Sequence, residues 1–206
     1  MKKVDLKKEF KNLYNPSSKE IEIVKVPKMN FIMVDGMGDP NISKDYSGSI
    51  EVLYSVSYTI KFIFKKEKDI DYSVMPLEGL WWAEDMNKFK TEDKDKWLWT
   101  SMIMQPDFVT RGIFEKAVEQ VKIKKNLPML SKIRFQSFNE GLSVQIMYIG
   151  PYSAETLTIE KLHKFVKESG HNLRGKHHEI YLSDPRKTAP ERIKTIIRQP
   201  IEPIVL

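Results

Sequence analysis

The sequence predicts a single-domain α+β protein in which a strand–helix–strand–strand unit occurs twice. Short alternating apolar and polar segments, typical of half-buried strands, are separated by three longer segments with helical periodicity. The same order of elements occurs in both halves of the chain. A chain of 206 residues, of which 41% are hydrophobic, is long enough to bury one large core.

Residues 1–19 are predicted to form a polar lead-in before a domain at 20–206, whose first half ends near residue 126 and whose second begins near 127. No apolar segment follows the first lysines, so the sequence does not predict a secretory signal. No stretch has the length of a membrane span. The chain has no cysteine, which excludes disulfides and thiolate chemistry. We therefore expect a cytoplasmic protein without membrane contact.

The first half is predicted to contain a long helix and a β-hairpin. Its predicted elements are strands at 20–26, 31–34 and 72–75, a turn at 35–40, a helix at 43–66, and a hairpin of 77–84 and 97–105 with a charged loop at 88–96. The residues expected on or near the buried stripe of the helix are Ile50, Leu53, Tyr54, Ser57, Tyr58 and Phe62.

Two helices are predicted after the hairpin. The first covers 110–124 and is expected to bury Ile113, Phe114, Ala117, Val118 and Val121. The second covers 154–169 and is expected to bury Leu157, Leu162, Phe165 and Val166. The predicted strands of this half lie at 133–138, 142–149, 178–182 and 193–198, with a turn at Gly141 between the first two.

An internal repeat links the two halves. LWWAED at 80–85 and EIYLSD at 179–184 each follow a helix and precede a loop and a final strand. Aligning Asp85 with Asp184 places Trp82 against Tyr181, and Leu80 against Glu179. Two such units are predicted to be related by a pseudo-twofold axis around a central ligand pocket.

The net charge of +6 does not define a partner. Lysines are scattered along the chain and interleaved with acidic residues, which is typical of solvated helix faces. No nucleic-acid-binding motif accompanies them, so we expect no direct contact with nucleic acid.

All four tryptophans fall in the predicted hairpin. Neighbouring strand residues face opposite ways, so Trp81 and Trp82 are separated, whereas Trp97 and Trp99 share a face. Large rigid aromatic rings form pocket walls and bind cations, but they also pack hairpins and cores. We expect the four tryptophans to be ligand contacts, together with Tyr54 and Tyr152, and packing remains the alternative.

Glu179 is the strongest candidate for chemistry. It lies in a strand that should be covered, where a carboxylate needs a partner or has a raised pKa. Strand alternation puts Glu179 and Tyr181 on one face, which supplies a carboxylate and a phenol side by side. The alternative is an exposed glutamate on an edge strand. Glu78 is a weaker candidate, because it is predicted to lie in a turn.

Metal and cofactor sites are not expected. Adjacent strand histidines such as His177 and His178 point apart, and only His163 and His171 remain besides them. The Gly-x-Ser-x-Gly motif of one class of serine hydrolases is absent.

Met147–Ile201 resembles the GyrI-like small-molecule-binding domain, which is also the effector-binding module of multidrug-sensing transcription regulators. The elements that carry the resemblance are Gly150-Pro151-Tyr152, Glu179-Ile180-Tyr181, Asp184-Pro185 and the closing 195–200 segment. Val24–Pro40 resembles the opening strands of the family. The resemblance implies a cavity in which Glu179 meets cationic aromatic ligands, with Tyr152 and Tyr181 close to it.

Residues 76–82 resemble a stand-alone branch of that family, which is linked to hydrolysis of cyclopropane-bearing, DNA-alkylating genotoxins. The resemblance implies a detoxifying hydrolase with Glu179 and Tyr181 as catalytic residues. A non-catalytic binding, sequestering or sensing protein remains open, as does an inhibitory partner of DNA gyrase. The lead-in is too short for a helix-turn-helix, which departs from the regulator members.

Overall fold

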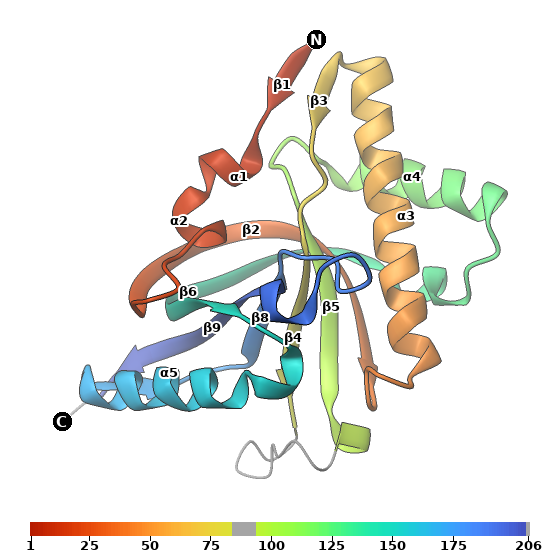
Figure 1. Ribbon diagram of the computed structural model, residues 1–206. Helices are drawn as coiled ribbons and strands as arrows, with labels where there is room; N and C mark the ends of the chain where they lie inside the picture. Colours follow the sequence, from red (N-terminus) through yellow and green to blue (C-terminus); the bar gives the residue numbers. More distant parts are fainter. Residues whose placement is uncertain (84–93, 205–206) are drawn as a thin grey trace. The chain divides into compact units, whose positions relative to one another are not determined.

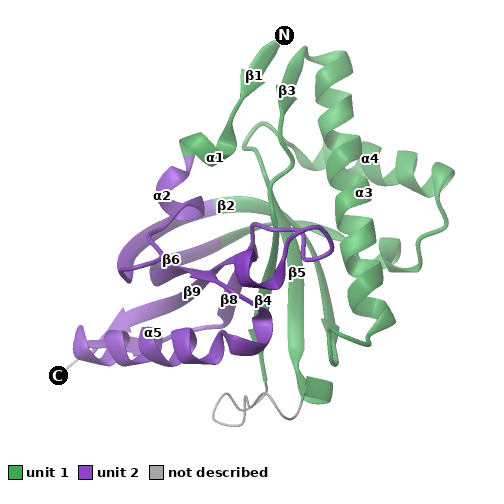
Figure 2. Ribbon diagram, viewed as in Figure 1, with its two compact units in different colours: residues 1–9, 29–138 green, residues 10–28, 139–206 purple. Residues whose placement is uncertain are grey.

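The computed structural model describes residues 1–83 and 94–204 and contains both helices and strands, which confirms the α+β prediction (Figure 1). The chain forms two compact units, coloured separately in Figure 2. Unit 1 comprises residues 1–9 and 29–138, and unit 2 comprises residues 10–28 and 139–206. No helix in the described ranges is long and apolar enough to cross a membrane.

The hairpin predicted from the tryptophan-rich segments is the centre of unit 1. The strands of this unit are β1 (Lys2–Val4), β3 (Ile70–Tyr72), β4 (Leu77–Trp82), β5 (Leu98–Gln105), the end of β2 (Glu22–Met37) and the start of β6 (Arg134–Ile149). β5 pairs antiparallel with both β2 and β4, which confirms the hairpin. β1 and β3 form a separate parallel pair. Most of the predicted loop at 88–96 lies outside the described residues.

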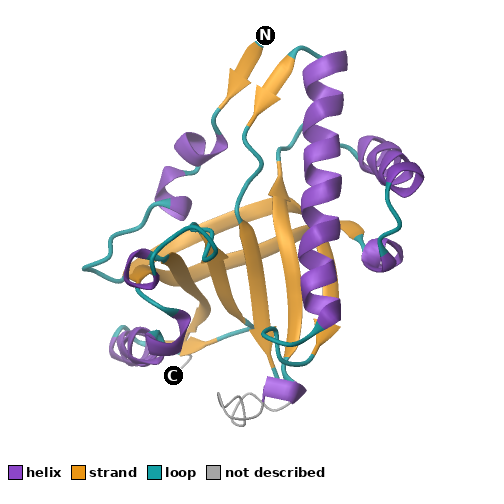
Figure 3. Cartoon of the chain, turned by 45° about the vertical axis from the view of Figure 1, so that its right-hand side comes forward, coloured by secondary structure: helices purple, strands orange, loops and turns teal. Residues whose placement is uncertain are grey.

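The α-helices in the described part of unit 1 are α1 (Leu6–Glu9), α3 (Lys44–Glu67) and α4 (Arg111–Lys124). The side-chain oxygens of Ser43 and Thr110 accept hydrogen bonds from backbone N–H groups of the first turns of α3 and α4, so both helices begin where the sequence predicts. Figure 3 shows α3 running alongside the strands. The Ser49 and Ser101 hydroxyls, 3.1 Å apart, tie α3 to β5.

The buried stripe of α3 differs from the predicted one. The buried residues of the helix are Ser49, Val52, Leu53, Val56, Ser57, Ile60, Ile63 and Phe64. Tyr58 and Phe62 are 46% and 50% exposed, and Ile50 and Tyr54 are only partly buried. Apolar residues cover more than half of the helix circumference, so periodicity alone could not select the face that meets the sheet.

In unit 2, one long helix packs against the strands. It contains α2 (Lys11–Tyr14), the start of β2, most of β6, α5 (Thr156–Glu168), β7 (His171–Leu173), β8 (His177–Tyr181) and β9 (Lys194–Pro203). β9 pairs antiparallel with β6, β7 and β8. Residues 152–154 and 190–192 form short 3-10 turns.

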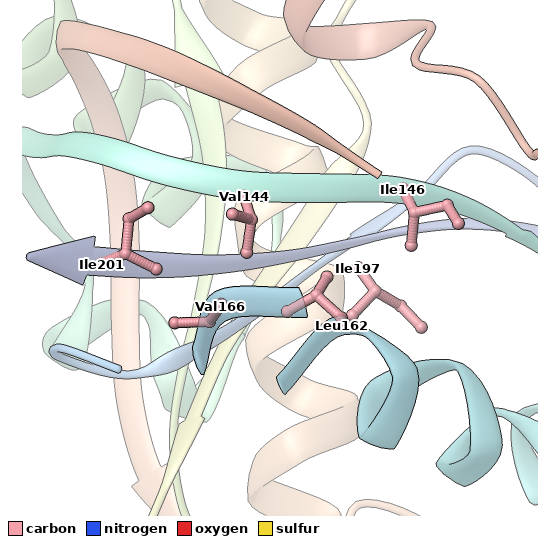
Figure 4. Close-up of a cluster of buried hydrophobic side chains, with 6 residues drawn as sticks. All are labelled: Val144, Ile146, Leu162, Val166, Ile197 and Ile201. Atoms are coloured by element: carbon pink, nitrogen blue, oxygen red, sulfur yellow. The ribbon is translucent and has the colours of Figure 1, made fainter. Parts of the chain in front are cut away.

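The core of unit 2 lies between α5 and the sheet. Figure 4 shows its six buried side chains, which are Val144, Ile146, Leu162, Val166, Ile197 and Ile201. Leu157, predicted to belong here, is 76% exposed. It precedes Leu162 by five residues, which places it about 140° away around the helix.

The two units repeat one connectivity. In each, a long strand, a helix, a short strand and two further strands follow in order, and the last strand pairs with the first long strand and with the strand before it. The pseudo-twofold axis and the central pocket remain predictions.

Two predicted breaks in strands are wrong. β2 continues from Glu22 to Met37 without interruption at Pro27, and β6 continues from Arg134 to Ile149 through Gly141. Gly141 has a φ of 78°, a left-handed conformation that favours glycine, and the strand continues through it where the sequence indicates a turn.

The polar lead-in is more ordered than its composition indicates. It forms β1, α1 and α2, in which Leu6, Leu13 and Tyr14 are buried. A segment with so few apolar residues gives no periodic signal in the sequence. Its burial depends on partners far away in the sequence.

Candidate functional site

β8 carries the candidate site of unit 2. Its five residues alternate between the two faces of the sheet, and Glu179 pairs with Ile197 of β9. Ile197 belongs to the core beneath α5, so Glu179 lies on the same face of the sheet as α5. His178 pairs with Arg198 and lies on the other face.

The carboxylate of Glu179 is held by the side chains two residues before it and two residues after it on β8. The Tyr181 hydroxyl donates a hydrogen bond to Glu179 Oε2 at 2.7 Å, and His177 Nε2 lies 3.1 Å from Glu179 Oε1. The side chain of Glu179 is 12% exposed, which leaves part of the carboxylate accessible. Each carboxylate oxygen has two acceptor positions, so Glu179 retains capacity for a ligand or a water molecule.

Tyr152 adds a second phenol beside this pair. Its ring meets that of Tyr181 edge to face, with centroids 5.9 Å apart, and Tyr152 is 37% exposed. The Tyr148 hydroxyl donates to the Pro151 carbonyl at 2.8 Å and thereby holds the loop from which Tyr152 projects. Burial, followed by the charge of Glu179, raises the pKa of Tyr152 to about 12. Tyr152 therefore stays a neutral hydrogen-bond donor.

A second histidine, His163, lies on α5, the helix that packs on the Glu179 face of the sheet. Burial, followed by the charge of His177, lowers the pKa of His163. The α5 face of unit 2 thus combines a carboxylate, two phenols and two imidazoles. Such a set can accept a proton, donate one and neutralise a cation.

The opposite face of β8 holds a buried ionic network. His178 Nδ1 lies 2.9 Å from Glu140 Oε1, and Arg198 Nη1 lies 3.3 Å from Glu140 Oε2. Arg198 also donates to the Leu13 carbonyl at 2.7 Å and to Gln145 Oε1. Burial alone would raise the pKa of Glu140, but the charges and hydrogen bonds of His178 and Arg198 lower it to about 2. Both faces of the strand that carries Glu179 are thereby fixed.

Three of the four tryptophans pack together in unit 1. Trp81 pairs across the hairpin with Trp99, and both indoles contact the Tyr46 ring of α3, at 5.6 and 5.1 Å between centroids. Trp97 meets Trp81 at 5.8 Å. Trp99 is fully buried and passes over Gly36, where a Cβ atom would collide with the indole. Trp99 therefore has no surface to offer a ligand and acts in packing.

Trp82 and Glu78 lie on the face of the hairpin that does not meet α3. Trp82 is partly exposed, and Glu78 is fully buried rather than in an exposed turn. Tyr54 lies apart from these residues, on the outer side of α3 beside a surface groove. Alternation along the strands of the hairpin thus places Trp81 and Trp99 on the face toward α3 and Trp82 on the opposite face.

The internal alignment made from the sequence places residues of opposite sheet faces against one another. It pairs Leu80 and Trp82 with Glu179 and Tyr181, yet Trp81 is the residue that lies on the helix face of unit 1. Asp85, the anchor of the alignment, lies outside the described residues. Similarity between two short sequences does not determine which face of a strand each residue occupies, whereas the pairing of strands in the structure does.

Sequence reasoning missed His177, His163 and Glu140. The His-x-Glu-x-Tyr spacing of β8 was the available signal for His177, because alternate strand residues share a face. The separation of His177 and His178 to opposite faces is confirmed by their partners, Glu179 and Glu140. Within the described residues, no group of three or more His, Asp or Glu side chains could hold a metal ion.

Comparison with known proteins supplies the family. The model of the GyrI-like small molecule binding domain matches residues 19–202. A crystal structure of an uncharacterized conserved protein from Listeria innocua is 44% identical, covers 97% of this chain and 100% of its own, and has a TM-score of 0.90. No curated protein sequence matches.

Two further solved structures are similar. A hydrolase from Listeria innocua is 44% identical, with 98% of this chain and 100% of that chain covered and a TM-score of 0.88. The C-terminal domain of EcmrR is 14% identical over 90% of this chain and 98% of its own, with a TM-score of 0.56, which shows a shared fold. The chain belongs to the GyrI-like small molecule binding domain family.

Proposed function

We propose that this protein is a hydrolase that binds planar, largely apolar or cationic small molecules and opens strained cyclopropane rings by adding water. The observation that carries the proposal is the hydrogen-bonded pair of Tyr181 and Glu179, 2.7 Å apart and partly accessible beneath Tyr152. The similarity to a Listeria innocua hydrolase at 44% identity supports a catalytic reading.

Glu179 and Tyr181 together can carry out all proton transfers that the proposed reaction needs. In the proposed reaction, water oxygen bonds to a ring carbon, and the ring C–C bond breaks with its electrons moving to a conjugated carbonyl oxygen. Glu179 takes the proton that water loses, and Tyr181 gives its proton to the carbonyl oxygen. Glu179 then returns a proton to Tyr181 through their hydrogen bond. General acid–base assistance of this kind is worth about 10²–10⁴-fold.

The aromatic rings supply binding. Tyr152 and Tyr181 offer a phenol edge and face to a flat ligand, and Glu179 offers a negative charge to a cationic one. His177 holds the second carboxylate oxygen, so the carboxylate plane is set before a ligand arrives. Trp82 and Trp97, which are partly exposed, remain proposed ligand contacts, whereas Glu78 is fully buried and has no surface to offer a ligand.

The test is turnover of a cyclopropane-bearing DNA-alkylating agent by the protein and by three variants. Glu179→Gln should reduce kcat by at least about 100-fold, and Tyr181→Phe by at least about tenfold, because each interrupts these proton transfers. Glu160→Gln, on the exposed side of α5, is the matched control and should leave kcat unchanged.

Binding of the same compound is measured in parallel. Retained affinity with lost turnover in Glu179→Gln would support the assignment. Tight binding of intact compound by the unaltered protein, with no product, would remove the enzymatic claim and leave a sequestering protein.

A further inference from the structure

A groove on the outer side of α3 lies in unit 1 and shares no residue with the Glu179 site. It has a volume of about 410 Å³ and is lined by the outer side chains of α3 and the last turn of α4. That volume is within the range of small-molecule pockets. Its lining residues all belong to unit 1 and come from α3, the end of α4 and Lys125 directly after it.

Three aromatic rings form a ladder along this groove. Tyr54, Tyr58 and Phe62 follow one another at intervals of four residues, which places them on one side of α3. The Tyr54 and Tyr58 rings are stacked, with centroids 6.3 Å apart and planes 30° from parallel. Tyr58 and Phe62 are about half exposed although they are large and apolar. A contiguous exposed aromatic surface of this kind is typical of a binding site.

The cationic wall of the groove comes from the end of α4. Lys124 and Lys125 both line it, and Lys125 is held by a hydrogen bond of 3.1 Å from its Nζ to the Ser55 hydroxyl. Lys124 is exposed and makes no ion pair in the described part of the chain. The one acidic lining residue is Glu51, one turn of α3 before Ser55. Charge in the groove is thus net positive, with its acid at one end.

The packing of α3 against α4 holds these walls in place. Lys116 Nζ of α4 lies 2.6 Å from Glu67 Oε1 of α3, and Lys132 Nζ, in the segment that follows α4, lies 3.0 Å from Asp45 Oδ2 in the first turn of α3. Val121 of α4 is buried at the base of the groove. A ligand would therefore meet aromatic and lysine side chains whose backbone positions are already set.

We propose that this groove is a second ligand site, which takes planar aromatic anions such as aryl carboxylates. The ring of the ligand lies on the ladder of Tyr54, Tyr58 and Phe62, and its carboxylate pairs with Lys124. The sign of the charge separates the two sites, because Glu179 favours cationic or neutral ligands and the lysine wall favours anions. The inference does not rest on the proposed hydrolase activity.

The experiment uses three naphthalene probes of the same shape and different charge: 2-naphthoate, neutral 2-naphthylmethanol and the 2-naphthylmethylammonium cation. Backbone amide NMR titrations of the full chain give both affinity and location. We expect 2-naphthoate to bind about three- to tenfold more tightly than the alcohol. Its shifts should centre on the amides of Ser55, Thr59 and Val121.

Variants assign the contacts. Tyr58→Ala should weaken 2-naphthoate binding about three- to tenfold, and Lys124→Gln about two- to fivefold with loss of the preference over the alcohol. Glu51→Gln should tighten it about twofold by removing a like charge. Lys66→Gln, an exposed lysine of α3 outside the groove, is the matched control and should change nothing. Melting temperatures within a degree of the parent would show that each variant folds.

Several results would overturn the proposal. The first is equal affinity for the three probes, and the second is an equal effect of Lys66→Gln and Lys124→Gln. The third is concentration-dependent dimerisation that Tyr58→Ala abolishes, which would make the groove a contact between two copies of the chain. Loss of 2-naphthoate binding in Glu179→Gln would assign the probe to the other site, whereas an inactive but naphthoate-binding protein would refute only the hydrolase.

Discussion

Replacing Glu140 by glutamine should destabilise the protein strongly although the two side chains have nearly the same shape. The side chains of Glu140 and Arg198 are 1% and 0% exposed, and they are joined at 3.3 Å. Glutamine would leave Arg198 buried without a carboxylate, a change that typically costs about 3–5 kcal/mol. The pKa of about 2 for Glu140, against its ordinary 4.5, corresponds to about 3 kcal/mol at 1.36 kcal/mol per pKa unit.

The destabilisation caused by Glu140→Gln should depend on pH. Because the folded state lowers the pKa of Glu140, its stabilisation is present above about pH 4.5 and is lost as the pH falls toward 2. The free energy of unfolding of Glu140→Gln should therefore be about 3 kcal/mol below that of the parent at pH 7, with a smaller difference at about pH 3. Urea titration followed by far-UV circular dichroism measures both values.

A matched control separates this effect from a general loss of charge. Glu160→Gln removes an exposed carboxylate of α5 in the same unit and should change the free energy of unfolding by less than about 0.5 kcal/mol. The reasoning is refuted if Glu140→Gln behaves like Glu160→Gln at pH 7, or if its destabilisation is the same at pH 3.

Two further predictions concern the aromatic residues. Gly36→Ala should lower the free energy of unfolding by about 1–3 kcal/mol in urea titrations, because the new methyl group would displace the buried Trp99 indole. Gly112→Ala is the control, since its Cβ would meet open space, and it should change the free energy of unfolding by less than about 1 kcal/mol. Equal effects of the two substitutions would contradict the packing role of Trp99. Because the pKa of Tyr152 is about 12, the ligand affinities of the parent and Tyr152→Phe should keep a constant ratio from about pH 8 to pH 10. A ratio that follows an ionisation within that range would show that the phenol titrates lower.

Local patterns predicted the elements of this fold well. Ser43 and Thr110 mark the starts of α3 and α4 in the sequence, and the alternation of the hairpin predicts β4 and β5. What local patterns could not predict was continuity through Pro27 and Gly141, because proline and glycine usually interrupt a strand, whereas β2 and β6 run through them. Long-range pairing decides such cases.

The candidate site was partly predictable for the same reason. Alternation along β8 places Glu179 and Tyr181 on one face, which their hydrogen bond confirms. The tryptophans were harder, because composition does not distinguish an indole that packs from one that binds. Gly36, across the strand pair from Trp99, makes room for the indole, and that pairing becomes visible only with the strand register.

The most direct test of the central claim is turnover of a cyclopropane-bearing DNA-alkylating agent in ¹⁸O-labelled water, followed by mass spectrometry of the product. We predict ring-opened product in excess over protein, with one ¹⁸O atom in each molecule, and loss of that product in Glu179→Gln. Product without ¹⁸O, a covalent adduct on the protein, or undiminished turnover in Glu179→Gln would contradict hydrolysis by water at Glu179.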